Sequence, residues 1–326
     1  MKRYKIVNIQ RLDICEIGNL KVLVAGPGTI GASLALACAS HGHSVTLLGR
    51  SEASLERARK LISRCAGELE DASLVSAEHN GWQDRLTMTV QLQEVPRDCS
   101  IAIEAINEDL SDKQELIAAL QSQLQETAVL ASSTSGLPVD LIAANCARAS
   151  KFAVAHFANP PHLMPVVEIV PGRKTSPETL ASIEEFVQSL NKTPVRLNHD
   201  VPGHLFNRIQ FAMLREAMAL VEKGIATPEQ IDTVVKRGLA LRLAEEGPLE
   251  KIDLAGLQLV HDVASYLYPQ LDNSQEPELL KKMLGEGKKG ASSGQGFFSW
   301  DTERETRVLT RRNAEVIRHL QKLKQE

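Results

Sequence analysis

The sequence lacks any apolar run long enough to cross a lipid bilayer. A transmembrane helix needs about 20 predominantly apolar residues, whereas the apolar stretch at residues 30–39 is short and is followed by His-Gly-His. The first twenty residues also lack the continuous apolar segment of a secretory signal peptide. We therefore expect a cytoplasmic protein with no membrane partner.

An excess of positive charge is missing as well. The chain has 37 basic against 41 acidic side chains, a formal net charge of -4, so no general attraction to nucleic acid or anionic lipid is expected. Cysteine is sparse, because the five cysteines are scattered and contain no C-x-x-C spacing. This pattern argues against a disulfide framework and against a zinc site. We expect reduced thiols, no metal and a small-molecule substrate.

What the sequence does contain is a regular alternation of apolar strands and helices. Residues 21–50 read KVLVAGPGTIGASLALACASHGHSVTLLGR, which predicts a strand, a glycine-rich turn, a helix ending near His41 and a second strand. This alternation is typical of an α/β fold with a doubly wound, mainly parallel Rossmann-type sheet covered by helices on both faces. Further strands are predicted at residues 86–90, 101–104, 128–132, 152–156, 166–170 and 193–197, and helices at residues 54–74, 110–125 and 177–190.

The strand pattern stops at Pro202-Gly203, and the remaining chain has helical periodicity. A length of 326 residues suits two domains. The last helix, at residues 303–324, is rich in charge and is expected to be solvated. We predict an N-terminal extension at residues 1–20, a dinucleotide-binding domain at residues 21–201 and an all-α C-terminal domain at residues 202–326.

The hexapeptide GPGTIG follows the first strand and opens the first helix, as the G-x-G-x-x-G dinucleotide fingerprint requires. Gly26 permits the tight turn, Gly28 lets backbone amides approach a pyrophosphate, and Gly31 allows close packing of helix and strand. Thr29 and Ile30 form the start of the helix, where the positive end of its dipole favours an anion. The turn predicts a nicotinamide dinucleotide, with FAD as the other ligand that the fingerprint permits.

The end of the second strand departs from the usual NAD pattern. The carboxylate that would hold the ribose 2'-hydroxyl is missing, and the sequence has Gly49-Arg50-Ser51. Arg50 could make a charge-assisted contact to a 2'-phosphate, and Ser51 could donate a hydroxyl. These residues favour NADP over NAD, the alternative being that Arg50 is a surface charge and NAD is the cofactor.

Six segments occur in the order and spacing of a known family, and the resemblance extends from Lys21 to about Trp300. The chain resembles the 3-hydroxyacyl-CoA dehydrogenase family. Within it, the chain is similar to the lambda-crystallin and gulonate dehydrogenase branch, particularly in SSTS and NPP. The segments are GPGTIG, IEAINEDLSDKQEL, ASSTSGLP, AHFANPPHLMPVVEIVPG, VPGHLFNRIQFAMLREAMALVEKGIATPEQID and GPLEKIDLAGL.

His156 and Glu168 are the predicted catalytic pair. His156 ends one strand and Glu168 lies in the next, so a turn through Asn159-Pro160-Pro161 can bring imidazole and carboxylate together. A carboxylate on one ring nitrogen fixes the tautomer and stabilises the imidazolium, which leaves the other nitrogen to take a hydroxyl proton. The family's catalytic histidine and glutamate match the same two positions.

The resemblance also implies that Ser135 and Asn207 bond the reacting oxygen, and both are neutral donors that would not compete for the proton. Ser133 replaces the asparagine usual in the fatty-acid enzymes, and Gly136 replaces a second serine. These departures put the acyl chain and its carrier in question more than the chemistry.

Glu104 and Lys113 match family positions that line the cofactor and substrate cleft. Glu104 ends a strand at the carboxyl edge, where open α/β sheets bind ligands, whereas Lys113 could equally be a surface charge.

The leading hypothesis is an L-3-hydroxyacyl-CoA dehydrogenase that acts on a short or polar 3-hydroxy substrate. The polar character of Ser133, Ser135, His162 and Asn207 supports a short substrate. The resemblance implies a homodimer formed by the C-terminal domain. Two alternatives stay open: a dehydrogenase of a free 3-hydroxy acid, and a non-catalytic dinucleotide-binding protein, against which the four intact site residues argue.

Overall fold

The computed structural model describes residues 19–74 and 81–323, and the predicted N-terminal extension lies outside these ranges except for its last two residues. The chain divides into two compact units. The first unit consists of two segments, the chain up to Asn207 and the chain from Asn313 onward. The second unit comprises Arg208–Arg312. The division falls shortly after the predicted boundary at residue 202, and the end of the chain groups with the first unit.

The described part of the first unit contains one eight-stranded sheet with the order β3-β2-β1-β4-β5-β6-β7-β8. Every neighbouring pair is parallel except β6 and β7, which are antiparallel. The predicted Rossmann-type sheet is confirmed, with strand bounds within two residues of those expected. The strands are β1 (Lys21–Ala25), β2 (Ser44–Leu48), β3 (Leu86–Thr89), β4 (Ile101–Glu104), β5 (Val129–Ser132), β6 (Phe152–Phe157), β7 (Val166–Pro171) and β8 (Thr193–Arg196).

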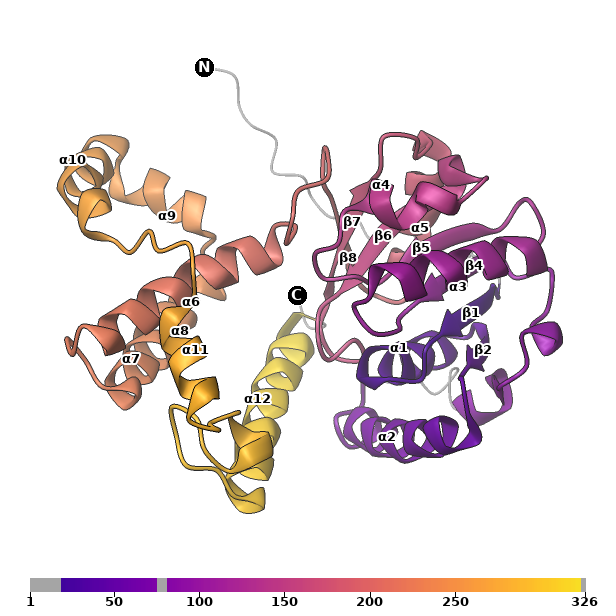
Figure 1. Cartoon of the computed structure of the whole chain (residues 1–326), viewed down its shortest axis with the longest axis horizontal. Helices are drawn as coiled ribbons and strands as arrows, with labels where there is room; N and C mark the ends of the chain where they lie inside the picture. The colour runs from indigo at the N-terminus through magenta and orange to yellow at the C-terminus, as the bar shows by residue number, and fades with distance from the viewer. Residues whose placement is uncertain (1–18, 75–80, 324–326) are drawn as a thin grey trace. The chain divides into compact units, whose positions relative to one another are not determined.

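Helices cover both faces of this sheet (Figure 1). Side chains from α1, α2 and α5 form one core with alternate strand residues such as Val22 and Val24, and α3 and α4 pack with the intervening residues such as Leu23 on the other face. Burial on both faces explains why the central strands are apolar along their whole length. The helices are α1 (Thr29–Ala39), α2 (Glu52–Asp71), α3 (Leu110–Gln123), α4 (Val139–Ile142) and α5 (Pro177–Ser189).

The second unit is helical and has almost no interior of its own. Ala219 is the single buried apolar residue within Arg208–Arg312, all of which the structure describes. No helix of the described residues is both long and apolar enough to span a membrane. The helices that lie in or run through this unit are α6 (Phe206–Glu222), α7 (Pro228–Val234), the π-helix Val235–Leu239, α8 (Ala240–Leu243), α9 (Pro248–Ala255), α10 (Leu257–Leu267), α11 (Glu278–Gly285) and α12 (Thr302–Leu323).

The terminal helix α12 contains no buried residue, in agreement with the solvated helix that the sequence predicts, but the packing of its last part was not predicted. Its last part, from Asn313, belongs to the first unit, where Val316 and Ile317 pack against the core that includes α1 and α2. The high charge content concealed these two apolar side chains, because they occupy a narrow stripe on an otherwise polar helix.

Candidate active site

The glycine-rich turn connects β1 to α1 in a conformation that only glycine accommodates at two positions. Gly26 has φ +116°, and a Cβ atom there would come within 2.5 Å of the Ala105 carbonyl oxygen. A Cβ atom on Gly31 would come within 1.8 Å of the Gly26 carbonyl oxygen. A Cβ on Gly28, in contrast, would meet no atom within 4 Å. The turn is therefore closely packed at Gly26 and Gly31 and open at Gly28, where a ligand can approach the backbone.

A pocket of about 700 Å³ lies against this turn, between the carboxyl ends of β1, β2 and β4. Gly28 is the N-cap of α1, and no acidic side chain lies in the first turn of that helix, which Thr29 and Ile30 begin. The amides of this turn can therefore bind an anion with no carboxylate in the same turn of the helix. The residues present fit a dinucleotide, whose pyrophosphate the backbone amides around Gly28 would bind.

The side of the pocket formed by β2 and α2 carries two arginines. Arg50, predicted from the sequence, lines the pocket, and Arg57 of α2 joins it. Sequence reasoning missed Arg57, for which the available signal was a basic residue early in the helix after the second strand. Ser51 has another task, since its hydroxyl caps α2 by accepting the Ser54 amide at 3.3 Å.

The predicted pair of imidazole and carboxylate forms on the antiparallel hairpin β6–β7. His156 and Glu168 are direct cross-strand partners, and His156 Nδ1 lies 2.8 Å from Glu168 Oε2. Both side chains are largely buried, with exposed fractions of 9% and 4%. Because a carboxylate only accepts, the ring proton lies on Nδ1 when the imidazole is neutral, and Nε2 has a free lone pair.

Glu168 is held by two more donors. Its Oε1 accepts the amides of Leu205 at 2.7 Å and Phe206 at 2.9 Å, where α6 begins. Burial by itself raises the pKa of Glu168, but the hydrogen bonds from His156, Phe206 and Leu205 outweigh burial and lower the pKa below its ordinary value. The carboxylate is therefore charged at neutral pH and can stabilise an imidazolium at His156.

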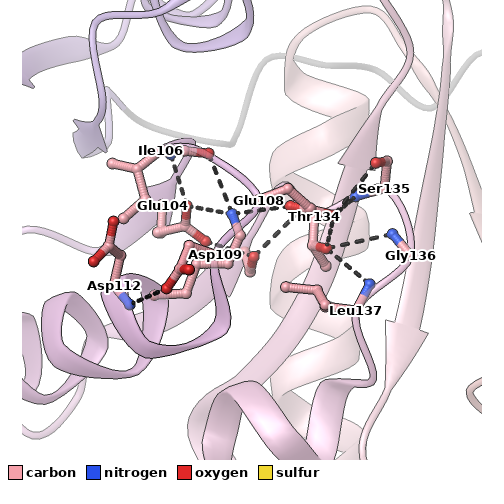
Figure 2. A network of polar contacts seen from close by, with 11 residues as sticks. Glu104, Ile106, Glu108, Asp109, Asp112, Thr134, Ser135, Gly136 and Leu137 are labelled. Carbon is pink, nitrogen blue, oxygen red and sulfur yellow. Dashed lines mark hydrogen bonds and ion pairs between the residues drawn. The ribbon is translucent and has the colours of Figure 1, made fainter. Parts of the chain in front are cut away.

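Ser135 and Asn207 are brought together, since Asn207 Nδ2 donates to the Ser135 carbonyl at 2.9 Å. A third residue, Glu108, organises this loop (Figure 2). Its Oε1 accepts the Ser135 amide at 3.0 Å, the Ser135 hydroxyl at 3.3 Å and the Thr134 hydroxyl. Glu108 was missed in the sequence, although an acidic residue just beyond a strand's carboxyl end was a usable signal.

Glu104 and Lys113 form a buried ion pair at 2.7 Å, with exposed fractions of 0% and 1%. Lys113 is therefore not the surface charge that its helical position also allowed. Glu104 further accepts the Ile106 amide at 2.7 Å (Figure 2). It also accepts the Ser132 hydroxyl at 2.6 Å. Neither Glu104 nor Lys113 lines the pocket, so in this structure the pair supports the loop after β4, and a contact with the cofactor stays a prediction.

His162 and His204 are both buried, and for His162 this differs from the sequence-based expectation. His162 does not offer a polar group to a cleft, because its side chain is 2% exposed and bonds to Ser33 and Glu68. His204 is fully buried, and its ring centroid lies 5.4 Å from that of His156. Burial, and then the neighbouring His156, lower the pKa of His204. It is therefore a neutral neighbour of the His156 ring.

Two relatives resemble the chain over most of its length. The 5-formyl-3-hydroxy-2-methylpyridine 4-carboxylate 5-dehydrogenase of Mesorhizobium japonicum is 32% identical over 298 residues, covering 91% of this chain and 95% of that protein. A probable 3-hydroxybutyryl-CoA dehydrogenase of Deinococcus radiodurans is 33% identical over 283 residues, covering 86% of this chain and 100% of that protein.

A solved structure and two family models agree with these relatives. The crystal structure of a 5-formyl-3-hydroxy-2-methylpyridine 4-carboxylic acid 5-dehydrogenase, described as an NAD+ dependent dismutase, has a TM-score of 0.88 at 29% identity and covers 94% of this chain and 99% of that one. The model of the 3-hydroxyacyl-CoA dehydrogenase NAD binding domain matches residues 21–201. The model of the C-terminal domain of the same enzymes matches residues 203–300. The chain belongs to the 3-hydroxyacyl-CoA dehydrogenase family.

Proposed function

We propose that this chain catalyses reversible hydride transfer between NAD and C3 of a short 3-hydroxyacyl-CoA. The observation that carries the proposal is the buried His156–Glu168 contact of 2.8 Å, in a chain that also has the glycine turn and the pocket of a dinucleotide domain. A bound nicotinamide would accept the hydride. A non-catalytic dinucleotide-binding protein has no need for a charged carboxylate held by three donors.

In the oxidation direction, His156 acts as the general base. Its Nδ1–H donates to Glu168, so Nε2 receives the proton of the substrate hydroxyl as the hydride leaves carbon. The imidazolium that forms lies against a carboxylate that is already ionised. In the reduction direction the same nitrogen returns the proton to the developing alkoxide.

Ser135 and Asn207 are proposed to hold the reacting oxygen. The hydrogen bond from Asn207 Nδ2 to the Ser135 carbonyl holds the Asn207 side chain against the backbone of Ser135. Each of the two side chains has a donor to offer to a developing negative charge. For Ser135 this requires the hydroxyl to exchange its 3.3 Å bond to Glu108 for one to the substrate. The long distance makes that exchange inexpensive.

NAD is the proposed physiological cofactor, because the matching domain model and the solved relative both name it. The two arginines in the pocket and the absence of a carboxylate after β2 still favour a 2'-phosphate. NADP use therefore remains a prediction, and titration of the protein with NADH and NADPH decides between them.

A free carboxylate substrate is the second candidate. The relative with a TM-score of 0.88 is named for a pyridine carboxylate and not for a thioester. The resemblance of SSTS and NPP to the gulonate dehydrogenase branch points the same way. For a free acid the catalytic pair would act in the same way, and only the carboxyl group of the substrate would differ, being a free carboxylate and not a CoA thioester.

The test of the proposed function is a panel of 3-keto substrates with NADH and NADPH, followed by nucleotide absorbance. Acetoacetyl-CoA is expected to be reduced with the higher kcat/KM, and a free 3-keto acid more slowly. Activity confined to free acids would favour the second candidate. No turnover with either class in a protein that binds NADH would refute both.

A homodimer formed through Arg208–Arg312 is also proposed. This unit leaves large apolar side chains exposed, among them Ile209 at 66% and Phe211 at 62% of α6, and such surface is usually covered by another chain. Light scattering coupled to size exclusion should give twice the 35.7 kDa of one chain. A monomeric mass at micromolar protein would contradict the proposal.

A further inference from the structure

His162 lies in the turn that joins the two strands of the catalytic hairpin, between Phe157 of β6 and Val166 of β7. Its ring Nδ1 is 2.8 Å from the hydroxyl of Ser33, and its backbone amide donates to the same hydroxyl at 3.0 Å. Ser33 is a residue of α1, the helix that begins at the cofactor pocket. One serine thus holds the turn of the hairpin by both side chain and backbone.

The other ring nitrogen of His162 reaches a second helix. Nε2 is 3.1 Å from Glu68 Oε2 of α2, and the same oxygen accepts a hydrogen bond from the side-chain Nδ2 of Asn313 in α12 at 2.8 Å. A carboxylate cannot donate, so Nε2 carries the proton and Nδ1 accepts the Ser33 hydroxyl. Every hydrogen in this network then has one consistent position.

The order serine, histidine, glutamate is also that of a hydrolytic triad. Ser33 is 1% exposed and lies within α1, so no substrate carbonyl can reach its hydroxyl in this structure. A nucleophile must be accessible and activated by its base. The network therefore has no hydrolytic role, and its contribution comes from the elements that it joins.

Two of those elements, the hairpin and α1, are the ones that the reaction must hold in a fixed relative position. The amino end of α1 faces the dinucleotide pocket, and the hairpin carries His156 and Glu168. We infer that His162 is a positioning residue, which together with Ser33 locks the catalytic hairpin onto the cofactor-binding helix and so sets the position of His156 relative to the nicotinamide. The inference rests on the proposed hydride transfer at C3.

If His162 is a positioning residue, its two side-chain hydrogen bonds should contribute unequally to catalysis. A role in packing alone predicts no such difference. The bond from Ser33 joins the hairpin to α1, the helix whose amino end lies at the pocket, whereas the bond to Glu68 reaches the last turn of α2. The pocket residue Arg57 lies near the opposite end of α2. Loss of the Ser33 bond should therefore impair catalysis more than loss of the Glu68 bond. Misplacement of a catalytic group by about 1 Å can cost roughly 100-fold in rate.

Three variants separate the two bonds. Ser33→Ala removes the hydroxyl. His162→Asn retains an acceptor near Nδ1 but cannot reach Glu68, and His162→Gln retains a donor near Nε2 but loses the acceptor for Ser33. Ser40→Ala is the matched control, because Ser40 is a buried serine at the end of the same helix whose hydroxyl has no partner among the described residues.

We expect kcat to differ between the variants while their affinity for the cofactor stays the same. Ser33→Ala and His162→Gln should lower kcat at least about tenfold, with an unchanged Kd for NADH and a larger isotope effect with 4-deuterated NADH, since hydride transfer becomes slower. His162→Asn and Ser40→Ala should retain most of the wild-type kcat. If Ser33→Ala does not fold, the two His162 variants still form a matched pair.

Two results would overturn the inference. One is a kcat for His162→Gln equal to that of His162→Asn, with only the melting temperature lowered. The other comes from backbone amide exchange measured by mass spectrometry. Exchange at residues 158–165 should be faster in His162→Gln than in the wild type, but not in His162→Asn. Equal exchange in the two variants would contradict the positioning role of His162. Because amide exchange needs no substrate, it tests the lock even if the wild type reduces no 3-keto compound, an outcome that would refute the proposed function separately.

Discussion

The glycine turn follows the carboxyl end of β1, and the turn of the hairpin β6–β7 follows the carboxyl end of β6. These two regions of one sheet depend on different features of the chain. The glycine turn depends on backbone shape, since Gly26 and Gly31 leave no space for a Cβ atom. The hairpin depends on two side chains whose cross-strand register brings them to 2.8 Å. The contrast suggests that cofactor affinity and proton transfer are separable properties, and the following predictions test that separation.

The largest effect is expected for His156→Gln. Removal of a general acid-base group costs about 100- to 10,000-fold in kcat, and the glycine turn is untouched, so the Kd for NADH should not change. Steady-state assays measure kcat, and fluorescence titration measures the Kd for NADH. A large loss of NADH affinity would show that the hairpin also holds the cofactor.

Glu168→Gln should have a smaller effect of the same kind. One lost charge-assisted hydrogen bond is worth about 1.5–3 kcal/mol, which corresponds to roughly 10- to 150-fold in kcat.

The pH profile gives this variant a second readout. Glu168 is ionised at neutral pH because its pKa is lowered, and a charged carboxylate stabilises an adjacent imidazolium more than a neutral amide does. Oxidation needs the neutral imidazole, so the fall of kcat/KM at low pH should begin at a lower pH in Glu168→Gln. A profile identical to the wild type would remove Glu168 from the proton transfer.

Arg50→Ala tests the other side of the comparison. If Arg50 contacts a 2'-phosphate, NADPH binding should weaken by about 1.5–3 kcal/mol, while the Kd for NADH and the kcat at saturating NADH should change little. Arg57→Ala is the companion variant, because Arg57 lines the same pocket. Equal weakening of both nucleotides would show that Arg50 does not distinguish them.

The smallest effect concerns the acyl chain. An apolar slot would add about 0.8 kcal/mol for each buried CH₂, and we expect no such gain beyond about six carbons, so kcat/KM should be flat or falling with length. His162 no longer supports this prediction, since it is buried away from a cleft. The measurement is kcat/KM for 3-ketoacyl-CoA substrates from about C4 to about C16, and a maximum at the long end would contradict the prediction.

The sheet and its helices could be predicted because period and apolarity are local properties of the chain. The approach of His156 to Glu168 could be predicted because the chain doubles back between two consecutive strands, but their direct cross-strand register depends on the conformation of residues 158–165 and was not predicted. The donors to Glu168 from Leu205 and Phe206 could not be foreseen, because they depend on where α6 begins in space. The same holds for Glu108 and for Ser33 with His162, which are far apart in sequence and meet only in the folded chain.

The central claim is that His156 presents an unprotonated Nε2 to the substrate because Glu168 holds the proton on Nδ1. Nitrogen NMR of histidine-labelled protein measures this directly, with His156→Gln identifying the signal. The account predicts that, when the ring is neutral, Nδ1 is protonated and Nε2 is not. A neutral ring with its proton on Nε2 would leave no base facing the hydroxyl and would contradict the account.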